Sequence, residues 1–320
     1  MRRSTLLVSL LLIAFVIFSC SNEEPVAPEL SQNEEVTSLA KKGRGEEGDP
    51  AILALMHDMN AQLADMGLNL AVEEIQLFTI GNGRPANRIL QQPFRWVPND
   101  ARRAAQGDDL TYLIDLSDGA TASGLSAAQT EAVLDNSMTT WDTQPNCADM
   151  LDIVKRADGG ADPDIFDSFF PPFPPFGNPF LADIVNAGWL PRAFFGAVTG
   201  APDNVLAFSV TFIFTDDNGG PTDINGDNYL DTALNEVYFN DTFGTPGEPR
   251  AGNPWGISIN FPGFDVETVG THEFGHSFGE GHFGPPPTAV MNPVYAGIRL
   301  NLFPTDNAAY CANYGSWPNP

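Results

Sequence analysis

The sequence predicts a fold that combines α-helices with β-strands, and three observations support this class. Residues 110–116 and 205–214 are runs of apolar, β-branched and aromatic side chains, a composition typical of strands. Residues 126–142 instead repeat their apolar side chains at helical intervals. The chain also holds 30 glycines and 27 prolines among its 320 residues, so we expect long, turn-rich connections between these elements.

The remaining elements follow from the same two patterns. Residues 50–66 carry apolar side chains at helical spacing, and residues 70–80 resemble a strand. Residues 151–154 and 236–240 predict two further short strands. Residues 162–180 are so rich in proline and phenylalanine that they exclude both a helix and a central strand. Their rings line a binding surface or cover one side of the domain, and we favour the second.

The charge of the chain restricts its partners. Fifteen lysines and arginines oppose 41 aspartates and glutamates, which gives a net charge of −26. Such a chain repels phosphate backbones, so we expect no nucleic-acid partner. This acidity suits an exported protein kept soluble by its charge, or one that binds cations.

The N-terminus predicts export. Arg2 and Arg3 precede an apolar run over residues 6–18, which is too short to span a bilayer, so residues 1–19 are interpreted as a signal peptide. Cys20 at the end of this run resembles the lipidated cysteine of bacterial lipoproteins. The chain is then an outer-membrane or cell-surface lipoprotein that meets the membrane only through Cys20. The alternative is ordinary cleavage and secretion.

Composition divides the rest of the chain into three parts. Residues 20–48 are polar, charged and interrupted by proline, which predicts a disordered tether. Residues 49–93 form a small region of unknown role, for which a propeptide is one interpretation. Residues 94–320 form the main domain. After export Cys147 and Cys311 are the two cysteines besides Cys20, and we expect them to pair as a disulfide.

The strongest functional signal lies in residues 272–282, which read His-Glu-Phe-Gly-His-Ser-Phe-Gly-Glu-Gly-His and contain three of the four histidines. On a helix His272 and His276 lie one turn apart, so both imidazoles can bind one zinc ion. Gly279 can end the helix in a left-handed conformation and turn the chain so that His282 arrives as the third ligand.

Three histidine ligands leave one position of a tetrahedral zinc open, which is the arrangement of a catalytic site. Glu273, beside the first ligand, can hold the bound water and accept its proton, because the metal lowers the pKa of that water. Asp265 is the expected N-cap of the helix. Two alternatives stay open, namely histidines that coincide without a metal and a zinc clamp without chemistry.

This motif resembles that of the metzincin metalloproteases, and a second feature of the family follows it. Residues 289–295 read Ala-Val-Met-Asn-Pro-Val-Tyr, and the resemblance implies a Met-turn in which Met291 lies beneath the zinc as an apolar floor. Tyr295, four residues after the methionine, is similar to the matrixin subgroup. Two departures from that subgroup are Glu280, which puts a charge near the zinc, and Phe283, which follows the third histidine.

The resemblance, which extends over most of residues 94–320, implies an α+β zincin fold. Its parts are a twisted, mostly parallel, five-stranded sheet, an active-site helix over residues 265–278 and a small C-terminal subdomain. The implied function is that of a monomeric zinc-dependent metalloendopeptidase that hydrolyses extracellular proteins or peptides. The substrate is expected to pair with an edge strand at residues 205–209, and Pro293 and Tyr295 are expected to wall the pocket for the residue after the cut.

The rival function is a surface binding protein or adhesin that keeps the zincin fold and has lost turnover. The intact Glu273 argues against this alternative, and Glu280 is the sequence feature in its favour. Residues 21–146 contain no cysteine, so the cysteine-based latency switch of matrixin propeptides is missing.

A second metal site is suggested by Asp223, Asn225, Asp227 and Asp231, which place oxygen ligands along one short loop as calcium sites do. Leu234 occupies the position where an EF-hand requires glutamate, so the loop is not an EF-hand. Calcium and a simple acidic turn between strands both remain open here.

Overall fold

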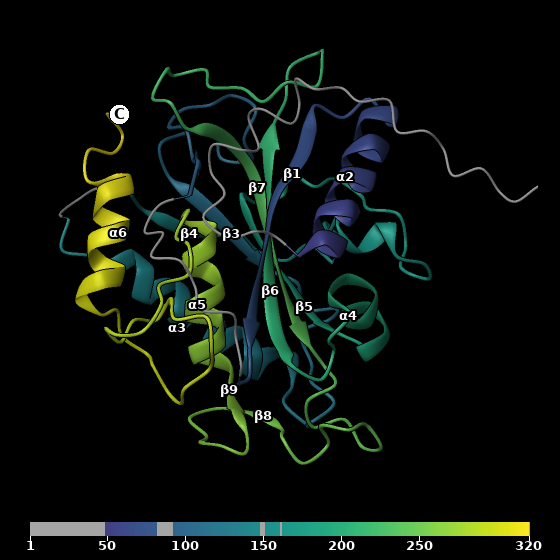
Figure 1. Cartoon of the computed structure of the whole chain (residues 1–320). Coiled ribbons are helices and arrows are strands. Elements are labelled where there is room, and N and C mark those ends of the chain that lie inside the picture. Colours follow the sequence, from purple (N-terminus) through teal and green to yellow (C-terminus); the bar gives the residue numbers. More distant parts are fainter. Residues whose placement is uncertain (1–48, 82–91, 148–150, 161, 320) are drawn as a thin grey trace, which may run out of the picture.

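The computed structural model describes residues 49–81, 92–147, 151–160 and 162–319. The predicted signal peptide, Cys20 and the tether lie outside the described residues. Within these residues the chain forms an α+β fold, in which five α-helices surround a seven-stranded sheet (Figure 1). In the described part of the chain, no helix is long and apolar enough to cross a membrane.

The sheet is mostly parallel. Its order is β1-β6-β7-β5-β3-β4, with β2 beside the start of β7. Strand β6 is antiparallel to both of its neighbours, and all other pairs are parallel. The strands are β1 (Leu70–Thr79), β2 (Phe94–Arg95), β3 (Leu110–Ile114), β4 (Ile153–Lys155), β5 (Ile184–Leu190), β6 (Val205–Phe214) and β7 (Leu230–Asn240).

The prediction of a five-stranded sheet is wrong, because β1 from the N-terminal region and the two-residue β2 join the strands of the main domain. Strand β5 had no counterpart among the predicted elements. All seven of its residues are buried, so it lacks the alternation of polar and apolar side chains that marks a half-exposed strand.

Helices cover both faces of the sheet. Helices α3, α5 and α6 lie on one face, and α2 and α4 lie on the other (Figure 1). A two-stranded sheet of β8 (Trp255–Gly256) and β9 (Phe264–Asp265) precedes α5. The helices are α2 (Pro50–Asp65), α3 (Ala127–Thr143), α4 (Arg192–Thr199), α5 (Val266–Ser277) and α6 (Pro304–Tyr314), with a 3-10 turn at Asp167–Phe169.

The proline- and phenylalanine-rich connection between β4 and β5 covers the α4 side of the sheet, as the sequence predicts. Phe166 is fully buried there, and Phe170 and Phe173 pack edge-on against Phe194 of α4. Contacts between aromatic edges and faces are favourable in addition to the area that they bury.

Helix α3 positions α5. The indole N–H of Trp141 donates to the carbonyl of Thr271 at 2.8 Å, and the hydroxyl of Ser137 donates to the carbonyl of Glu267 at 3.0 Å. Gly270 lets the two helices approach, because a Cβ there would lie 2.7 Å from a methyl group of Leu134. These contacts fix the height and rotation of α5 against the sheet.

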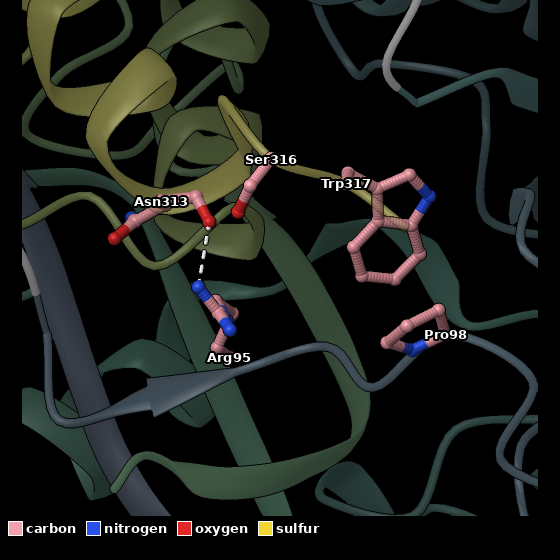
Figure 2. A pocket seen from close by; sticks show the side chains of 5 residues that line it. All are labelled: Arg95, Pro98, Asn313, Ser316 and Trp317. Atoms are coloured by element: carbon pink, nitrogen blue, oxygen red, sulfur yellow. Dashed lines mark hydrogen bonds between the residues drawn. The ribbon is translucent and has the colours of Figure 1, made fainter. Parts of the chain in front are cut away.

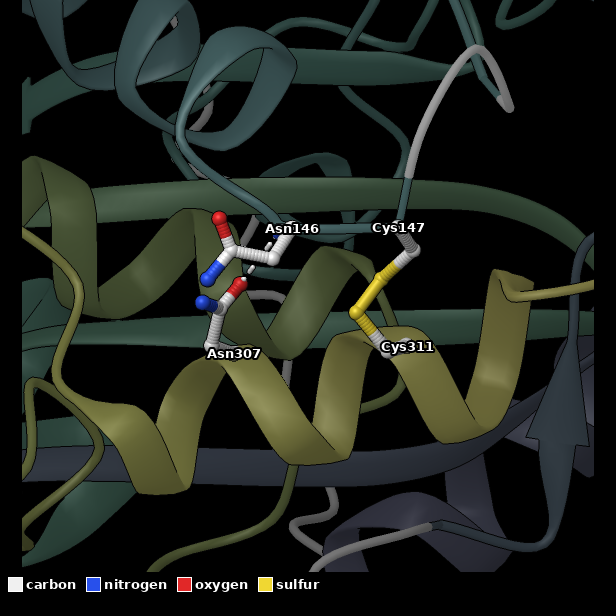
Figure 3. Close-up of a disulfide and its surroundings, with 4 residues drawn as sticks. All are labelled: Asn146, Cys147, Asn307 and Cys311. Carbon is white, nitrogen blue, oxygen red and sulfur yellow. Dashed lines mark hydrogen bonds between the residues drawn. A yellow bond between two sulfur atoms is a disulfide. The ribbon is translucent and has the colours of Figure 1, made fainter.

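A disulfide ties the last helix to the end of α3. Cys147 and Cys311 are joined with their Cα atoms 5.5 Å apart, which is within the usual range (Figure 3). Beside the disulfide, the backbone N–H of Asn146 donates to the side-chain oxygen of Asn307 at 2.9 Å. Helix α6 is therefore held at the α3–α5 layer by a covalent bond and a hydrogen bond.

Strand β1 brings the N-terminal region onto the edge that the sequence predicts for substrate. It pairs with β6 along the whole strand, from Leu70 opposite Phe214 to Thr79 opposite Val205. Residues 205–209 are therefore paired in this structure, and the expectation of a free edge there is wrong. The reason is that the N-terminal region folds onto the main domain and shares its core.

Candidate metal centre

Helix α5 carries the first two histidines and has the predicted ends. Asp265 caps its first turn, since one carboxylate oxygen accepts from the backbone N–H of Thr268 at 2.9 Å and from the hydroxyl of that residue at 2.7 Å. Beyond the helix Gly279 has a φ of 72°, the left-handed conformation. The next N–H, from Glu280, returns to the carbonyl of Gly275 at 3.1 Å.

This turn brings three imidazoles together. The ring centroids of His272, His276 and His282 are 4.8 to 5.2 Å apart, and all three residues are buried. The Nε2 atoms of His272 and His282 are 3.2 Å apart. Two nitrogen ligands of a tetrahedral zinc with bonds of 2.0–2.1 Å would be about 3.3 Å apart. The spacing matches that of ligands to one ion.

Backbone carbonyls orient two of the rings. Nδ1 of His272 lies 2.8 Å from the carbonyl oxygen of Val290, and Nδ1 of His276 lies 2.6 Å from that of Glu280. A carbonyl can only accept, so each Nδ1 carries the proton and each Nε2 keeps a free lone pair. Burial lowers the pKa of His276 to about 4, and its Nε2 has no partner among the described residues.

Glu273 follows the first histidine and is fully buried. Neither of its carboxylate oxygens has a hydrogen-bond partner in the described part of the chain, and burial raises its pKa well above the ordinary value. An uncompensated buried carboxylate is costly unless a positive charge lies near it. Neutral imidazoles with free lone pairs and an unpartnered carboxylate together fit a divalent cation, so these residues fit zinc.

The segment around Met291 packs against α5, the helix that carries the first two histidines. A Cβ on Gly275 of α5 would lie 2.9 Å from the methyl group of this buried methionine, so only glycine permits the contact. Asp306 in the first turn of α6 accepts the backbone N–H groups of Val290 at 2.9 Å and Met291 at 3.2 Å. No sequence pattern pointed to Asp306, which positions the residue whose carbonyl orients His272.

Glu280 does not place an exposed charge beside the histidines. Its side chain is buried, and burial, followed by repulsion from Asp306, raises its pKa well above the ordinary value. Burial therefore disfavours the charged form of this carboxyl group. Its backbone carbonyl, by contrast, is the acceptor that orients His276.

The end of strand β1 covers the triad. The ring of Phe78 stacks on that of His272, with the centroids 3.8 Å apart and the planes 13° from parallel. The backbone N–H of Thr79 donates to the carbonyl of Pro293 at 3.3 Å, and the N–H of Tyr295 donates to the carbonyl of Thr79 at 2.9 Å. Residues of the predicted substrate pocket are thus bonded to the protein's own N-terminal region.

The predicted calcium loop has other partners in the structure. Asp227 and Asp231 each form an ion pair with an arginine, and Asp223 and Asn225 bond to groups of the same loop. None of these four residues belongs to a group of three or more histidine, cysteine or acidic side chains that, in the described ranges, lie close enough to share an ion. Arginine side chains supply positive charge to this loop, which favours the acidic turn over the calcium site.

A small surface pocket lies at the end of α6 and contains no member of the triad (Figure 2). Arg95 donates to the backbone carbonyl of Asn313 at 2.9 Å and forms the ion pair with Asp227, so its guanidinium already has partners. The lining residues are Arg95, Pro98, Asn313, Ser316 and Trp317.

Comparison with protein-family models found no matching family, and comparison with curated proteins found no matching protein.

Proposed function

We propose that the chain is a zinc-dependent metalloendopeptidase of the metzincin type, with a zincin fold, that hydrolyses extracellular proteins or peptides at the cell surface. The observation that carries this proposal is the convergence of three buried imidazoles beside the carboxylate of Glu273, which has no hydrogen-bond partner among the described residues. Zinc bound by these imidazoles would supply a Lewis acid and a water of lowered pKa.

The chain's own residues have roles that follow from their positions. The imidazoles of His272, His276 and His282 would hold the ion, and backbone carbonyls fix the orientation of the first two rings. Glu273 has no hydrogen-bond partner in the described part of the chain, so its carboxylate is placed to accept a proton from water and to deliver it to the leaving amine. Met291, buried against Gly275 of α5, would form an apolar floor to the centre.

Strand β1 indicates how a peptide would lie in the site. Residues 76–79 run extended and antiparallel to β6, and Thr79 is bonded on its other side to Pro293 and Tyr295. An extended substrate can form the same main-chain pairs by strand addition. We propose that the substrate takes the place of β1, and that residues 49–93 are a propeptide that must leave the edge before turnover.

The second candidate is a surface binding protein that has lost turnover. The filled edge of β6 favours it. It shares the metal centre with the first candidate and differs from it in the role of Glu273, which would then be structural.

The experiment that separates the two candidates compares the wild type with Glu273→Gln, after β1 has been released, on unfolded casein. We expect both proteins to hold zinc and the variant to lose at least ~10²-fold in hydrolysis, because general acid–base catalysis contributes about that much or more. Glu267→Gln, in the first turn of the same helix, is the matched control and should keep full activity. Equal hydrolysis by wild type and Glu273→Gln, with zinc bound in both, would favour the binding protein.

A further inference from the structure

A second group of carboxylates lies away from the histidines, near the aromatic core under α4. Asp115 directly follows β3, and Asp162 and Asp164 lie in the connection from β4 to β5. One carboxylate oxygen from each of the three lies within 4.8 Å of the others. Four more acids lie close enough to influence them electrostatically. We call the whole set the acidic cluster: Asp115, Asp118, Asp158, Asp162, Asp164, Asp167 and Glu236.

Two of the three convergent side chains have an oxygen without any donor. Asp164 is 1% exposed and Asp115 is 0% exposed, and Oδ1 of the first and Oδ2 of the second have no partner among the described residues. The other oxygen of Asp115 shows the contrast, because it accepts from the N–H and the hydroxyl of Ser117 at 2.7 and 2.8 Å. Buried acceptors in folded proteins nearly always have a partner, so these two require an explanation.

Among the described residues, no positive side chain pairs with the acidic cluster. None of the ion pairs formed by the described residues includes one of its members. Burial, followed by repulsion from Glu236 and Asp167, raises the pKa of Asp164 well above its ordinary value. Elsewhere the chain does compensate a buried aspartate, since Asp183 pairs with the fully buried Arg103 at 3.2 Å.

We propose that Asp115, Asp162 and Asp164 bind a calcium ion. Calcium is a hard cation that takes six to eight oxygen ligands at flexible angles, and carbonyl groups and waters can complete such a shell. A set of ligands made only of carboxylates does not favour zinc or other softer metals. The ion ties the connection between β4 and β5 to the end of β3, and so stabilises the face of the sheet opposite the histidines.

The first test is isothermal titration calorimetry with calcium chloride on the zinc-loaded full chain in calcium-depleted buffer. The wild type should take up one calcium ion per chain. Asp164→Asn and Asp115→Asn should each weaken uptake at least ~10-fold, because each removes one of three anionic ligands. Asp223→Asn, in the loop whose aspartates pair with arginines, is the matched control and should leave uptake unchanged.

The second test is thermal unfolding of the same proteins, which also reports whether each variant folds. Calcium should raise the Tm of the wild type and of Asp223→Asn, because it binds only the folded state. Asp164→Asn should show no such gain, and without calcium its Tm should equal or exceed that of the wild type, since the amide carries no charge for the neighbouring acids to repel. The proposal is overturned if the wild type takes up no calcium and if its Tm is the same in the presence and in the absence of calcium. It is also overturned if Asp223→Asn abolishes uptake while Asp164→Asn retains it.

Discussion

Cutting the chain between β1 and β2 should release proteolytic activity. In the intact chain β1 is joined to the main domain through residues 82–91, so it competes for the β6 edge as an intramolecular ligand. A recognition sequence for a specific protease, inserted among these residues, would convert the region that carries α2 and β1 into a separate fragment. Dilution would then let this fragment dissociate from the edge.

The burial of β1 sets the size of the effect. Leu70, Val72 and Phe78 are 4%, 2% and 3% exposed. At 1.5–3 kcal/mol for each buried side chain, their burial contributes roughly 5–9 kcal/mol before the cost of ordering the strand. A net preference of even ~3 kcal/mol leaves the edge open in under about 1% of molecules. We therefore expect cutting and dilution to raise kcat/KM by about 10²-fold or more.

The assay follows hydrolysis of a quenched-fluorescent protein substrate, with zinc content measured in parallel and loss of the fragment checked by size-exclusion chromatography. In the uncut chain, Phe78→Ala should also raise activity, because losing a buried phenylalanine costs about 3–5 kcal/mol and weakens β1 next to the triad. Leu70→Ala weakens the far end of the same strand, opposite Phe214, and should have much less effect. A cut, fragment-free chain that holds zinc but hydrolyses substrate no faster than the intact chain would refute the assignment of β6 as the substrate edge.

Three further predictions concern stability. Replacing both disulfide cysteines by serine should lower the free energy of unfolding by up to about 5 kcal/mol, since the bond closes a loop with a sequence separation of 164; denaturant titration measures this, and an unchanged midpoint would contradict it. Gly275→Ala should destabilise the fold by about 1–3 kcal/mol, because the added Cβ would lie 2.8 Å from the indole of Trp141. The control is Gly196→Ala in α4, whose added Cβ would have its nearest neighbour at 3.7 Å, and it should not lower the Tm. Burial, followed by repulsion from Glu236, raises the pKa of Asp167 to about 8. The folded state therefore holds a proton that the unfolded chain loses near pH 4. In calcium-free buffer this group should therefore cost stability progressively from about pH 4 to pH 8, and Asp167→Asn should flatten the fall of Tm over that range, while an unchanged slope would count against the raised pKa.

Local features of the structure could be predicted from the sequence because neighbouring residues control them. Helix α5 begins at Asp265 because that carboxylate bonds to a backbone N–H three residues later. It ends before Gly279 because glycine adopts a positive φ without strain. With both ends set, the spacing of His272, His276 and His282 suffices to bring the three rings together. Strand β6 was likewise predictable, since its apolar run depends on its own residues.

Contacts between distant segments could not be predicted in this way. Residues 70–79 were recognisable as a strand, but their pairing with β6 depends on a complementary edge more than 100 residues further along the chain. Strand β5, buried on both faces, carries no periodic signal, so its place between β3 and β7 is decided by the sheet around it.

The sequence by itself determined the ends of the histidine helix, the ligand spacing and the two cysteines available to pair, because each depends on residue type and on a few neighbours. Only the tertiary structure decided which acidic groups are neutralised. Asp227 and Asp231 looked like calcium ligands until folding placed an arginine against each. Asp115 and Asp164 lie almost 50 residues apart, so no sequence pattern linked them. The fold buries them together, and no ion pair among the described residues gives either of them an arginine partner. Charge compensation acts through space at short range, so it depends on which distant segments the fold brings into contact.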